Sequence, residues 1–497
     1  MQKQQRHPDR LTRRSFLESS ASLAAAAVVA RQLQPFAAAT AEPAAAIDTR
    51  QASGIKVGEV TDNSAVVWIR VTAASSRNTA GPAVVGKVKS KKAGPITVPV
   101  AQLDGACPGA PGRVRLRYGT REDLSDAAGT GWADVSDATD FSHQHVLTGL
   151  KPSTTYYYAA ETASPGDSPA HAPISGKFET APPPDARTNM TFCVQTCQMY
   201  ADLDHPEGFH IYPSMGKVGA KFVVFTGDNV YYDNEEPRAV SADLARYHWE
   251  RMYSLPRHVE LLRNVPGYWE KDDHDTLSDD SWPGMHMGQL TFAKGQEIFK
   301  QQVPIAPDGK PYRTFRWGKD LQIWLTDGRD YRSPNNIPDG PDKTIWGKTQ
   351  KEWLKRTLAE SDATWKVLVS PTPLVGPDRT KKNDNHSNAG FSHEGDEIRQ
   401  WFKDNLPKDR FFVACGDRHW QYHSIHPGTG LREFSCGPAS DQHASGTPGY
   451  NPAYHQFHRV KGGFLTVTVK EDAGKSSILF RHHDVMGKVV HEWGTTA

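Results

Sequence analysis

The chain has 497 residues, more than one typical domain needs, and leaves room for two folded domains and a targeting segment. Its 58 Lys and Arg against 57 Asp and Glu give a net charge of +1, so there is no nucleic-acid-binding signal in the form of a basic surplus. Five cysteines are too few for a disulfide-built scaffold, and a mean hydropathy of −0.62 is typical of soluble, loop-rich proteins.

Residues 1–45 are expected to form an export signal. Arg13-Arg14-Ser15-Phe16-Leu17 precedes an apolar run at 21–30 and small residues at 37–46, an order that resembles a bacterial twin-arginine signal. The apolar run is shorter than the about 20 residues that a membrane span needs, so we expect no transmembrane segment in the mature protein. The pattern predicts export through the twin-arginine machinery to the periplasm or the extracellular space. A basic tail without targeting function is the alternative.

Residues 50–181 have the pattern of an all-β domain. Apolar or alternating runs bounded by turn residues predict strands at 55–60, 64–71 and 114–118. The stretch 150–158, a turn followed by three tyrosines, resembles a late strand of a fibronectin type III or immunoglobulin-like sandwich. Residues 72–113 indicate an insertion or a long hairpin. We expect this domain to pack against the rest of the chain and to shield an active site.

A second domain is expected over residues 189–497. The stiff linker Ala181-Pro182-Pro183-Pro184 precedes it, and strands then alternate with helical stretches such as 343–360. The tail at 462–493 returns to strands joined by turns. The pattern predicts an α/β (α+β) core, built as a mixed sheet or a two-layer sandwich covered by helices.

Five apolar strands of this second domain end in chemically active residues. They are the segments 190–198 ending in Thr-Cys-Gln, 222–232 ending in Gly-Asp-Asn-Val-Tyr-Tyr, 265–275 ending in Lys-Asp-Asp-His-Asp, 321–332 ending in Asp-Gly-Arg-Asp-Tyr-Arg, and 411–420 ending in Gly-Asp-Arg-His-Trp. Loops that leave the carboxyl ends of core strands form the crevice in which α/β proteins bind ligands. The sequence therefore predicts one site built from all five strand ends.

The residue types at these ends indicate more than one metal ion. Carboxylates favour hard cations, whereas imidazole and thiolate favour transition metals. Asp228 stands three residues before Tyr231, whose phenolate would suit ferric iron. Asp417 and His419 are two residues apart, so both side chains face the same side of an extended segment.

Such a site predicts the hydrolysis of a phosphate ester. Two metal ions would bridge a hydroxide between them and favour its in-line attack on phosphorus. His274 lies beside Asp273, so one side chain could bind metal while its neighbour reaches the substrate. His274 and Arg329 would protonate or neutralise the phosphate oxygens and the leaving group, and a guanidinium suits a forked contact to phosphate.

Taken in order along the chain, the five motifs resemble the PhoD-type alkaline phosphatases, calcineurin-like metallophosphoesterases related to purple acid phosphatases. The export signal and the N-terminal β domain resemble that family too. The resemblance implies a metallophosphoesterase sandwich core that uses Fe(3+) and Ca(2+) to release phosphate from small organic phosphate mono- and diesters. It implies a set of metal ligands comprising Cys197, Asp228, Tyr231, Asp273, Asp417 and His419. It also implies that His274 and Arg329 act on the phosphate.

One motif departs from the family pattern. The usual Trp-Asp-Asp-His-Glu is replaced here by Trp-Glu-Lys-Asp-Asp-His-Asp at residues 269–275, and Asp279 and Asp280 stand near positions where asparagines are common. The sequence therefore leaves open whether Asp272 or Asp273 is the ligand.

Each candidate residue also has a simpler interpretation. Cys197 fits a buried thiol at a strand end, Asp228 fits a turn, and Arg329 fits a partner for Asp327 or Asp330. Tyr231, His274 and His419 fit packing roles. We expect the following to be structural, in the core, on the surface or behind the ligands: Arg332, Cys193, Cys415, Cys436, His423, His426, His443, His455, His458, His482 and His483.

Several functions compete at this stage. The leading prediction is an exported metal-dependent phosphoesterase, and a phospholipase-like enzyme or a phosphotriester hydrolase on the same core is the nearest alternative. A sulfatase or carboxylesterase would use the same hydroxide, and no Gly-x-Ser-x-Gly elbow supports a serine route. A non-catalytic exported surface-binding protein would carry a closed, structural metal site, whereas a catalytic site keeps an open position.

Overall fold

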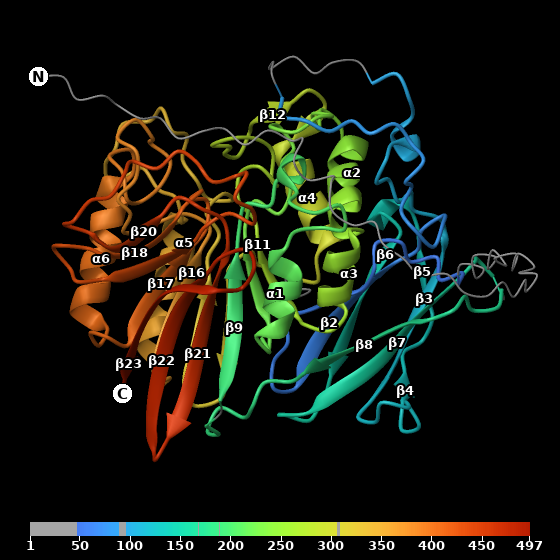
Figure 1. Ribbon diagram of the computed structural model, residues 1–497, viewed down its shortest axis with the longest axis horizontal. Coiled ribbons are helices and arrows are strands. Elements are labelled where there is room, and N and C mark those ends of the chain that lie inside the picture. The colour runs from blue at the N-terminus through green and yellow to red at the C-terminus, as the bar shows by residue number, and fades with distance from the viewer. Residues whose placement is uncertain (1–46, 89–95, 167, 188, 306–308) are drawn as a thin grey trace, which may run out of the picture. The chain divides into compact units, whose positions relative to one another are not determined.

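Two mixed β-sheets stack against each other, and helices cover their outer faces (Figure 1). The computed structural model describes residues 47–88, 96–166, 168–187, 189–305 and 309–497. The predicted export signal at 1–45 lies outside these residues. Within the described ranges, no helix is both long enough and apolar enough to span a membrane.

The first sheet has nine strands, and its middle strands run parallel. Their order is β23 (Val489–Thr496), β22 (Lys475–His483), β21 (Phe464–Asp472), β9 (Met190–Gln195), β10 (Val223–Thr226), β11 (Gly267–Glu270), β1 (Lys56–Gly58), β2 (Ser64–Arg70) and β6 (Ser142–Thr148). Strands β9, β10 and β11 are parallel neighbours, whereas β21 to β23 add antiparallel strands on one side. The carboxyl ends of β9 to β11 therefore lie at one edge.

The second sheet has seven strands and is also parallel at its centre. Their order is β14 (Arg313–Trp317), β15 (Leu321–Leu325), β16 (Trp365–Ser370), β17 (Phe411–Cys415), β19 (Arg432–Cys436), β18 (Gln421–Ile425) and β20 (His455–Arg459). Strands β15, β16, β17 and β19 are parallel neighbours. A two-stranded ribbon of β12 (His286–Met287) and β13 (Leu290–Thr291) stands apart from both sheets.

Alternate side chains of the core strands enter different layers. On β10, Val224 joins the cluster between the two sheets, together with Ile323 and Phe412 of the facing sheet. Its neighbours Val223 and Phe225 point to the other face and pack with the helices there. Because both faces of the sheet are buried at these strands, their sequences are continuously apolar. This continuous apolar pattern is what allowed the sequence to predict them.

Six α-helices form the outer layers: α1 (Ile211–Lys217), α2 (Ala242–Tyr253), α3 (Pro256–Leu262), α4 (Phe292–Gln302), α5 (Gly347–Glu360) and α6 (Ser392–Asn405), as counted in the described residues. Helices α1 to α4 cover the first sheet, and α5 and α6 cover the second. The helix expected at 343–360 begins four residues later. Thr344 and Ile345 instead bind the carboxylate of Glu394, which holds them outside the helix.

The described residues from 47 to 187 form strands and short 3₁₀ helices. A second group of strands comprises β4 (Ala128–Gly129), β3 (Gly112–Gly119), β7 (Thr155–Ala163) and β8 (Ile174–Glu179), with β5 (Ala133–Val135) paired to β3. The remaining strands, β1, β2 and β6, continue the nine-stranded sheet. A likeness to a fibronectin or immunoglobulin-like domain, and a division into domains at 50–181 and 189–497, stay predictions.

The junction between the N-terminal strands and the central sheet depends on a close backbone approach. Gly58 of β1 pairs in parallel with Gly267 of β11. A Cβ atom at Gly58 would lie 2.7 Å from the Gly267 carbonyl oxygen, so a larger residue would force the strands apart.

A buried ion cluster fastens the N-terminal strands to helix α2. Arg70 of β2 is 1% exposed, and its Nη2 lies 2.8 Å from Glu250 Oε1 and 3.1 Å from Asp140 Oδ1. The backbone N–H of Cys107 donates to Glu250 Oε2 at 2.8 Å. Burial raises the pKa of Glu250 to about 7, although Arg70 opposes this shift. The guanidinium therefore supplies the cation that these two buried acids share.

Replacing Arg70 tests this attachment. Arg70→Met leaves Asp140 and Glu250 facing each other, and breaking a buried ion pair in this way costs about 3–5 kcal/mol of unfolding free energy. We expect that loss in urea denaturation at pH 8, and a smaller one at pH 5.5, where Glu250, whose pKa is raised by burial, takes up a proton more readily. The exposed ion pair of Arg356 supplies the control, and Arg356→Met should change stability by less than about 1 kcal/mol. Equal losses in the two variants would contradict the account.

Candidate metal centre

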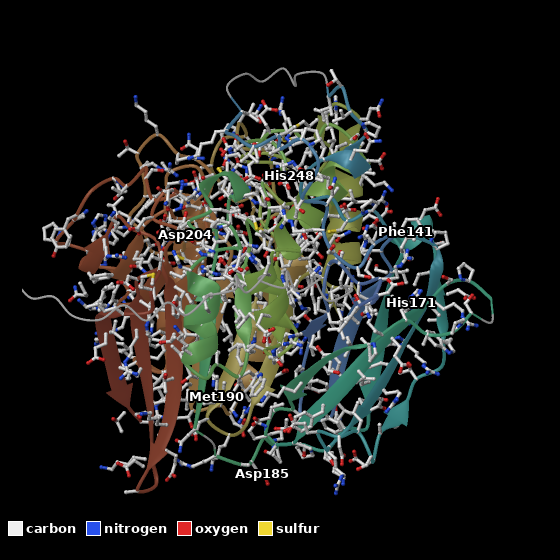
Figure 2. All side chains as sticks on the ribbon, turned by 45° about the vertical axis from the view of Figure 1, so that its right-hand side comes forward. Phe141, His171, Asp185, Met190, Asp204 and His248 are labelled. Atoms are coloured by element: carbon white, nitrogen blue, oxygen red, sulfur yellow. The ribbon has the colours of Figure 1, made fainter. Side chains whose placement is uncertain are left out.

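The carboxyl ends of the parallel strands of both sheets meet at one edge. The backbone N–H of Asp417, after β17, donates to Thr196 Oγ1 of the first sheet at 3.3 Å. The N–H of Thr326, after β15, donates to Glu270 Oε1 of β11 at 2.9 Å. Figure 2 shows Met190, where β9 begins, toward the lower end of the ribbon, with Asp204 and His248 well above it. The strand ends predicted to form one site are therefore brought together.

Three of the predicted ligands have an unusual backbone. The φ angles of Cys197, Asp228 and Asp417 are 51°, 54° and 58°, in the left-handed region that residues other than glycine seldom adopt. Each residue follows a core strand by one or two positions, so the same sharp turn ends three strands. Such strained residues cluster at functional sites, where the surrounding structure holds them.

The loop after β10 is fixed by the last acid of the Asp-Asp-His-Asp motif. Asp275 Oδ2 accepts hydrogen bonds from the backbone N–H of Asn229 at 3.0 Å and from its side-chain amide at 2.6 Å. Gly227 has a φ of 78°, and a Cβ there would lie 2.5 Å from Asp272 Cβ. Asp275 and Gly227 thus position Asp228 rather than act in the site themselves.

A first group of possible ligands consists of Cys197, Asp228 and His419, whose donor atoms all lie within 4.8 Å of one another. Asp228 Oδ2 is 3.3 Å from Cys197 Sγ and accepts a hydrogen bond from the Tyr231 hydroxyl at 2.9 Å. Burial and the Asp228 carboxylate raise the pKa values of the Cys197 thiol and the Tyr231 phenol well above their ordinary values. A cation here would supply the positive charge that lets a thiolate and a phenolate form.

Asp228 also belongs to two further groups, one with Asp272 and Asp417 and one with Asp273 and His274. It therefore stands where one carboxylate can serve two ions. Its Oδ1 is buried and has no hydrogen-bond partner among the residues that the structure describes, and the same is true of Asp272 Oδ2. Buried carboxylate oxygens are seldom left unpaired, so the donor set fits metal ions as partners.

Asp272 and Asp273 both lie beside the site, with different partners. Asp272 Oδ1 accepts from Arg329 Nε at 2.5 Å and leaves Oδ2 unpaired. Asp273 Oδ2 accepts from the Asp280 backbone at 2.6 Å and lies 3.6 Å from Arg329 Nη2. The unpaired oxygen favours Asp272 as a ligand over the expected Asp273.

His274 and Arg329, the two residues expected to act on phosphate, are buried in this cluster. His274 Nδ1 lies 2.6 Å from Asp233 Oδ1. Burial lowers the pKa of His274, but the Asp233, Asp273 and Asp228 carboxylates outweigh it and raise the pKa well above its ordinary value.

The alternative interpretation of Arg329 as a side-chain partner of Asp327 or Asp330 is wrong. The ammonium group of Lys271 contacts both of these carboxylates, at 2.7 Å for Asp330. The Arg329 guanidinium is thereby left to Asp272 and Asp273.

Sequence reasoning did not single out Asp202 and Asp233, and it placed His443 on the surface or behind the ligands. His443 is buried, and its Nε2 lies 3.0 Å from the Tyr231 hydroxyl and 3.1 Å from His419 Nε2. Its Nδ1 lies 2.8 Å from Asp202 Oδ2. The third residue, Asp233, is the partner of His274. Only Asp233 carried a usable signal, since it follows Asp228 in the same loop.

Two arginines near the site and the cysteines of the core occupy structural positions. Arg418 is buried, ion-paired with Asp378 and Asp384, and contacts Asp417. Arg332 is buried, as expected, and donates to Asn335 at 2.6 Å. All five cysteines are buried free thiols, which confirms the expectation that Cys193, Cys415 and Cys436 lie in the core.

Comparisons with known proteins agree with this fold. The sequence pattern of the family described as PhoD-like phosphatase matches residues 192–478, and that of the PhoD-like phosphatase N-terminal domain matches residues 37–182. Alkaline phosphatase D of Bacillus subtilis (strain 168) is 26% identical over a match that covers 44% of this chain and 43% of that protein. The chain therefore matches less than half the length of this curated relative.

Two solved structures share the fold at low identity. The structure of PhoD is 18% identical, with a TM-score of 0.68 over 92% of this chain and 90% of that one. Purple acid phosphatase PPD1 from yellow lupin (Lupinus luteus) seeds is 13% identical, with a TM-score of 0.61 over 88% of this chain and 73% of that one. The resemblance drawn from the five motifs is confirmed, because the family pattern covers more than half of the sequence: this protein belongs to the PhoD-like phosphatase family.

Proposed function

We propose that this protein is an exported, metal-dependent phosphoesterase that releases phosphate from small organic phosphate mono- and diesters. The observation that carries the proposal is Asp228, a buried carboxylate common to three groups of possible ligands, with one oxygen that has no protein partner. Family membership supports phosphate ester hydrolysis, and the donor set supports the metals. The signal-like sequence at 1–45 supports export through the twin-arginine machinery to the periplasm or the extracellular space.

The ligand set divides by chemical hardness. Cys197, Tyr231 and His419 offer sulfur, phenol and imidazole, which suit iron, and they surround one side of Asp228. The other side offers only carboxylates, which suit calcium: that of Asp417 and that of either Asp272 or Asp273. With the Fe(3+) and Ca(2+) that the family resemblance implies, the first group would hold the iron and the carboxylates the calcium, and Asp228 belongs to both groups. When bound, such ions acidify water and neutralise phosphate charge.

His274 and Arg329 would bind and orient the ester. The Nδ1 of His274 is engaged by Asp233, which fixes the ring and leaves Nε2 as the nitrogen that can donate to a phosphate oxygen or the leaving group. Arg329 is held at Nε by Asp272, and its Nη2 lies 3.6 Å from Asp273 Oδ2 within the acidic cluster. These cations offset part of the negative charge that a phosphate would otherwise meet there.

Hydrolysis assays with and without a chelator test the class of reaction. We expect the purified mature protein to hydrolyse a chromogenic phosphate monoester and the matching diester, and chelation to abolish both activities while circular dichroism shows that the fold survives. Restoring metal should restore turnover. The ratio of the two rates then separates a monoesterase from a diesterase. Absence of turnover in the metal-loaded protein would overturn the proposal, and loss of fold on chelation would favour a structural metal site.

Replacing His274 tests its role on the substrate. His274→Gln should lower kcat by about 10²–10⁴-fold, the range for loss of a general acid or base, with both metals retained. Metal content is measured in the same preparation by elemental analysis. His393→Gln changes an exposed histidine and should leave kcat unchanged. A His274→Gln enzyme with wild-type kcat would show that another group supplies the proton.

A further inference from the structure

We propose that Lys87, in the N-terminal part of the chain, is a positioning residue for catalysis. It acts through Asp202 and His443 on the candidate ligands Tyr231 and His419. The proposal rests on the function proposed above, and it assigns to the segment 84–88 a part in building the site. Three sets of contacts carry the inference.

The first set is a chain of polar contacts from the surface to the ligands. Lys87 Nζ lies 2.9 Å from Asp202 Oδ2, and the same oxygen lies 2.8 Å from His443 Nδ1. The side chain of Lys87 is 56% exposed, whereas those of Asp202 and His443 are 8% and 5% exposed. Because a single oxygen of Asp202 meets both the ammonium group and the imidazole, the ammonium group fixes the rotation of the carboxylate that orients the imidazole.

That imidazole faces two candidate ligands at once. His443 Nε2 lies 3.0 Å from the Tyr231 hydroxyl and 3.1 Å from His419 Nε2. A histidine held at one nitrogen by a carboxylate presents the other in a fixed direction, and such outer partners hold ligands in place. His443 therefore sets the positions of Tyr231 and His419 relative to each other.

The second set of contacts holds the loop that follows Tyr231. The backbone N–H of Val88 donates to the Asn234 carbonyl at 2.9 Å, and the N–H of Glu236 donates to the Gly86 carbonyl at 2.8 Å. Asn234 is adjacent to Asp233, the partner of His274. The segment 84–88 thus fastens the loop that orients His274, and its Lys87 fastens the carboxylate that orients His443.

The third set of contacts joins the loop that carries Asp233 to the residues around Asp202, and both to the segment 84–88. Glu235 is 1% exposed; it accepts from the Ala201 backbone at 2.7 Å and from Arg251 Nη2 at 2.7 Å. Ala201 directly precedes Asp202. Arg251 in turn donates to the Val84 carbonyl at 3.4 Å. Glu235 also lies near His248 of α2, the residue labelled in Figure 2. A small displacement of the segment is therefore transmitted to both loops.

Charge adds to the effect of geometry. Lys87 neutralises the charge of Asp202, which is separated from the candidate ligands in space only by His443. Without it, the Asp202 carboxylate would keep its charge beside a site that must accept an anionic phosphate. Loss of Lys87 should then act mainly on kcat, because the ligand geometry is needed most when charge develops in the transition state.

Kinetics of two Lys87 variants test the proposal. Lys87→Met keeps most of the side-chain length and removes the charge, and it should lower kcat about 10-fold, the scale of substitutions at residues that hold metal ligands, with KM changed less than about twofold. Lys87→Arg restores the cation and should recover most of kcat. Lys348→Met removes an exposed, ion-paired lysine from α5 and should behave like wild type. Unchanged kcat in Lys87→Met, or no rescue by Lys87→Arg, would overturn the proposal.

Hydrogen–deuterium exchange supplies a readout that does not depend on turnover. In the metal-loaded protein, Lys87→Met should speed amide exchange at 200–203 and 232–236, and Lys87→Arg should return it to the wild-type rate. Equal exchange rates in wild type and Lys87→Met at both of these segments would also overturn the proposal. If wild type hydrolyses no phosphate ester but the exchange result holds, the proposed function fails while the contact chain stands.

Discussion

The arrangement of this protein depends on burying many acids at one sheet edge. Asp228 is 1% exposed, and burial together with the neighbouring Asp272, Asp273 and Asp275 carboxylates raises its pKa well above the ordinary value, although His274 opposes this. Unpaired buried charges are among the costliest features a fold can contain. Protein cations offset part of that cost, and the oxygens of Asp228 and Asp272 that have no hydrogen-bond partner among the described residues mark where metal ions would offset more of it.

The two-sheet core makes such a concentration of acids possible. Parallel strands buried on both faces end at the same edge, and the left-handed turns after them aim Cys197, Asp228 and Asp417 at one region. The apolar packing between the sheets contributes free energy of folding, and this offsets the unfavourable free energy of the strained turns and the buried acids. Elements from distant parts of the sequence then complete the site, including the N-terminal segment that contributes Lys87.

The predictable part of the site follows from local pattern. Residues such as Asp228 and His419 come directly after continuous apolar strands, so the sequence alone places them at a strand end. Asp202, in the short 3₁₀ helix at Tyr200–Asp202, and His443, in a loop, lie far apart in the chain, and only tertiary packing brings them together. The pairing of β1 with β11 was missed for a similar reason, since a single contact at Gly58 decides it. The fold of the core was therefore accessible, whereas the layer that orients the ligands was not.

The central claim is that Asp228 holds two metal ions at once. The most direct test is elemental analysis of purified wild type and of Asp228→Asn, expressed in the same medium. The account predicts both iron and calcium in wild type and a joint loss of the two metals from the variant, because one carboxylate serves both. Loss of one metal with full retention of the other, or unchanged content of both, would contradict the account.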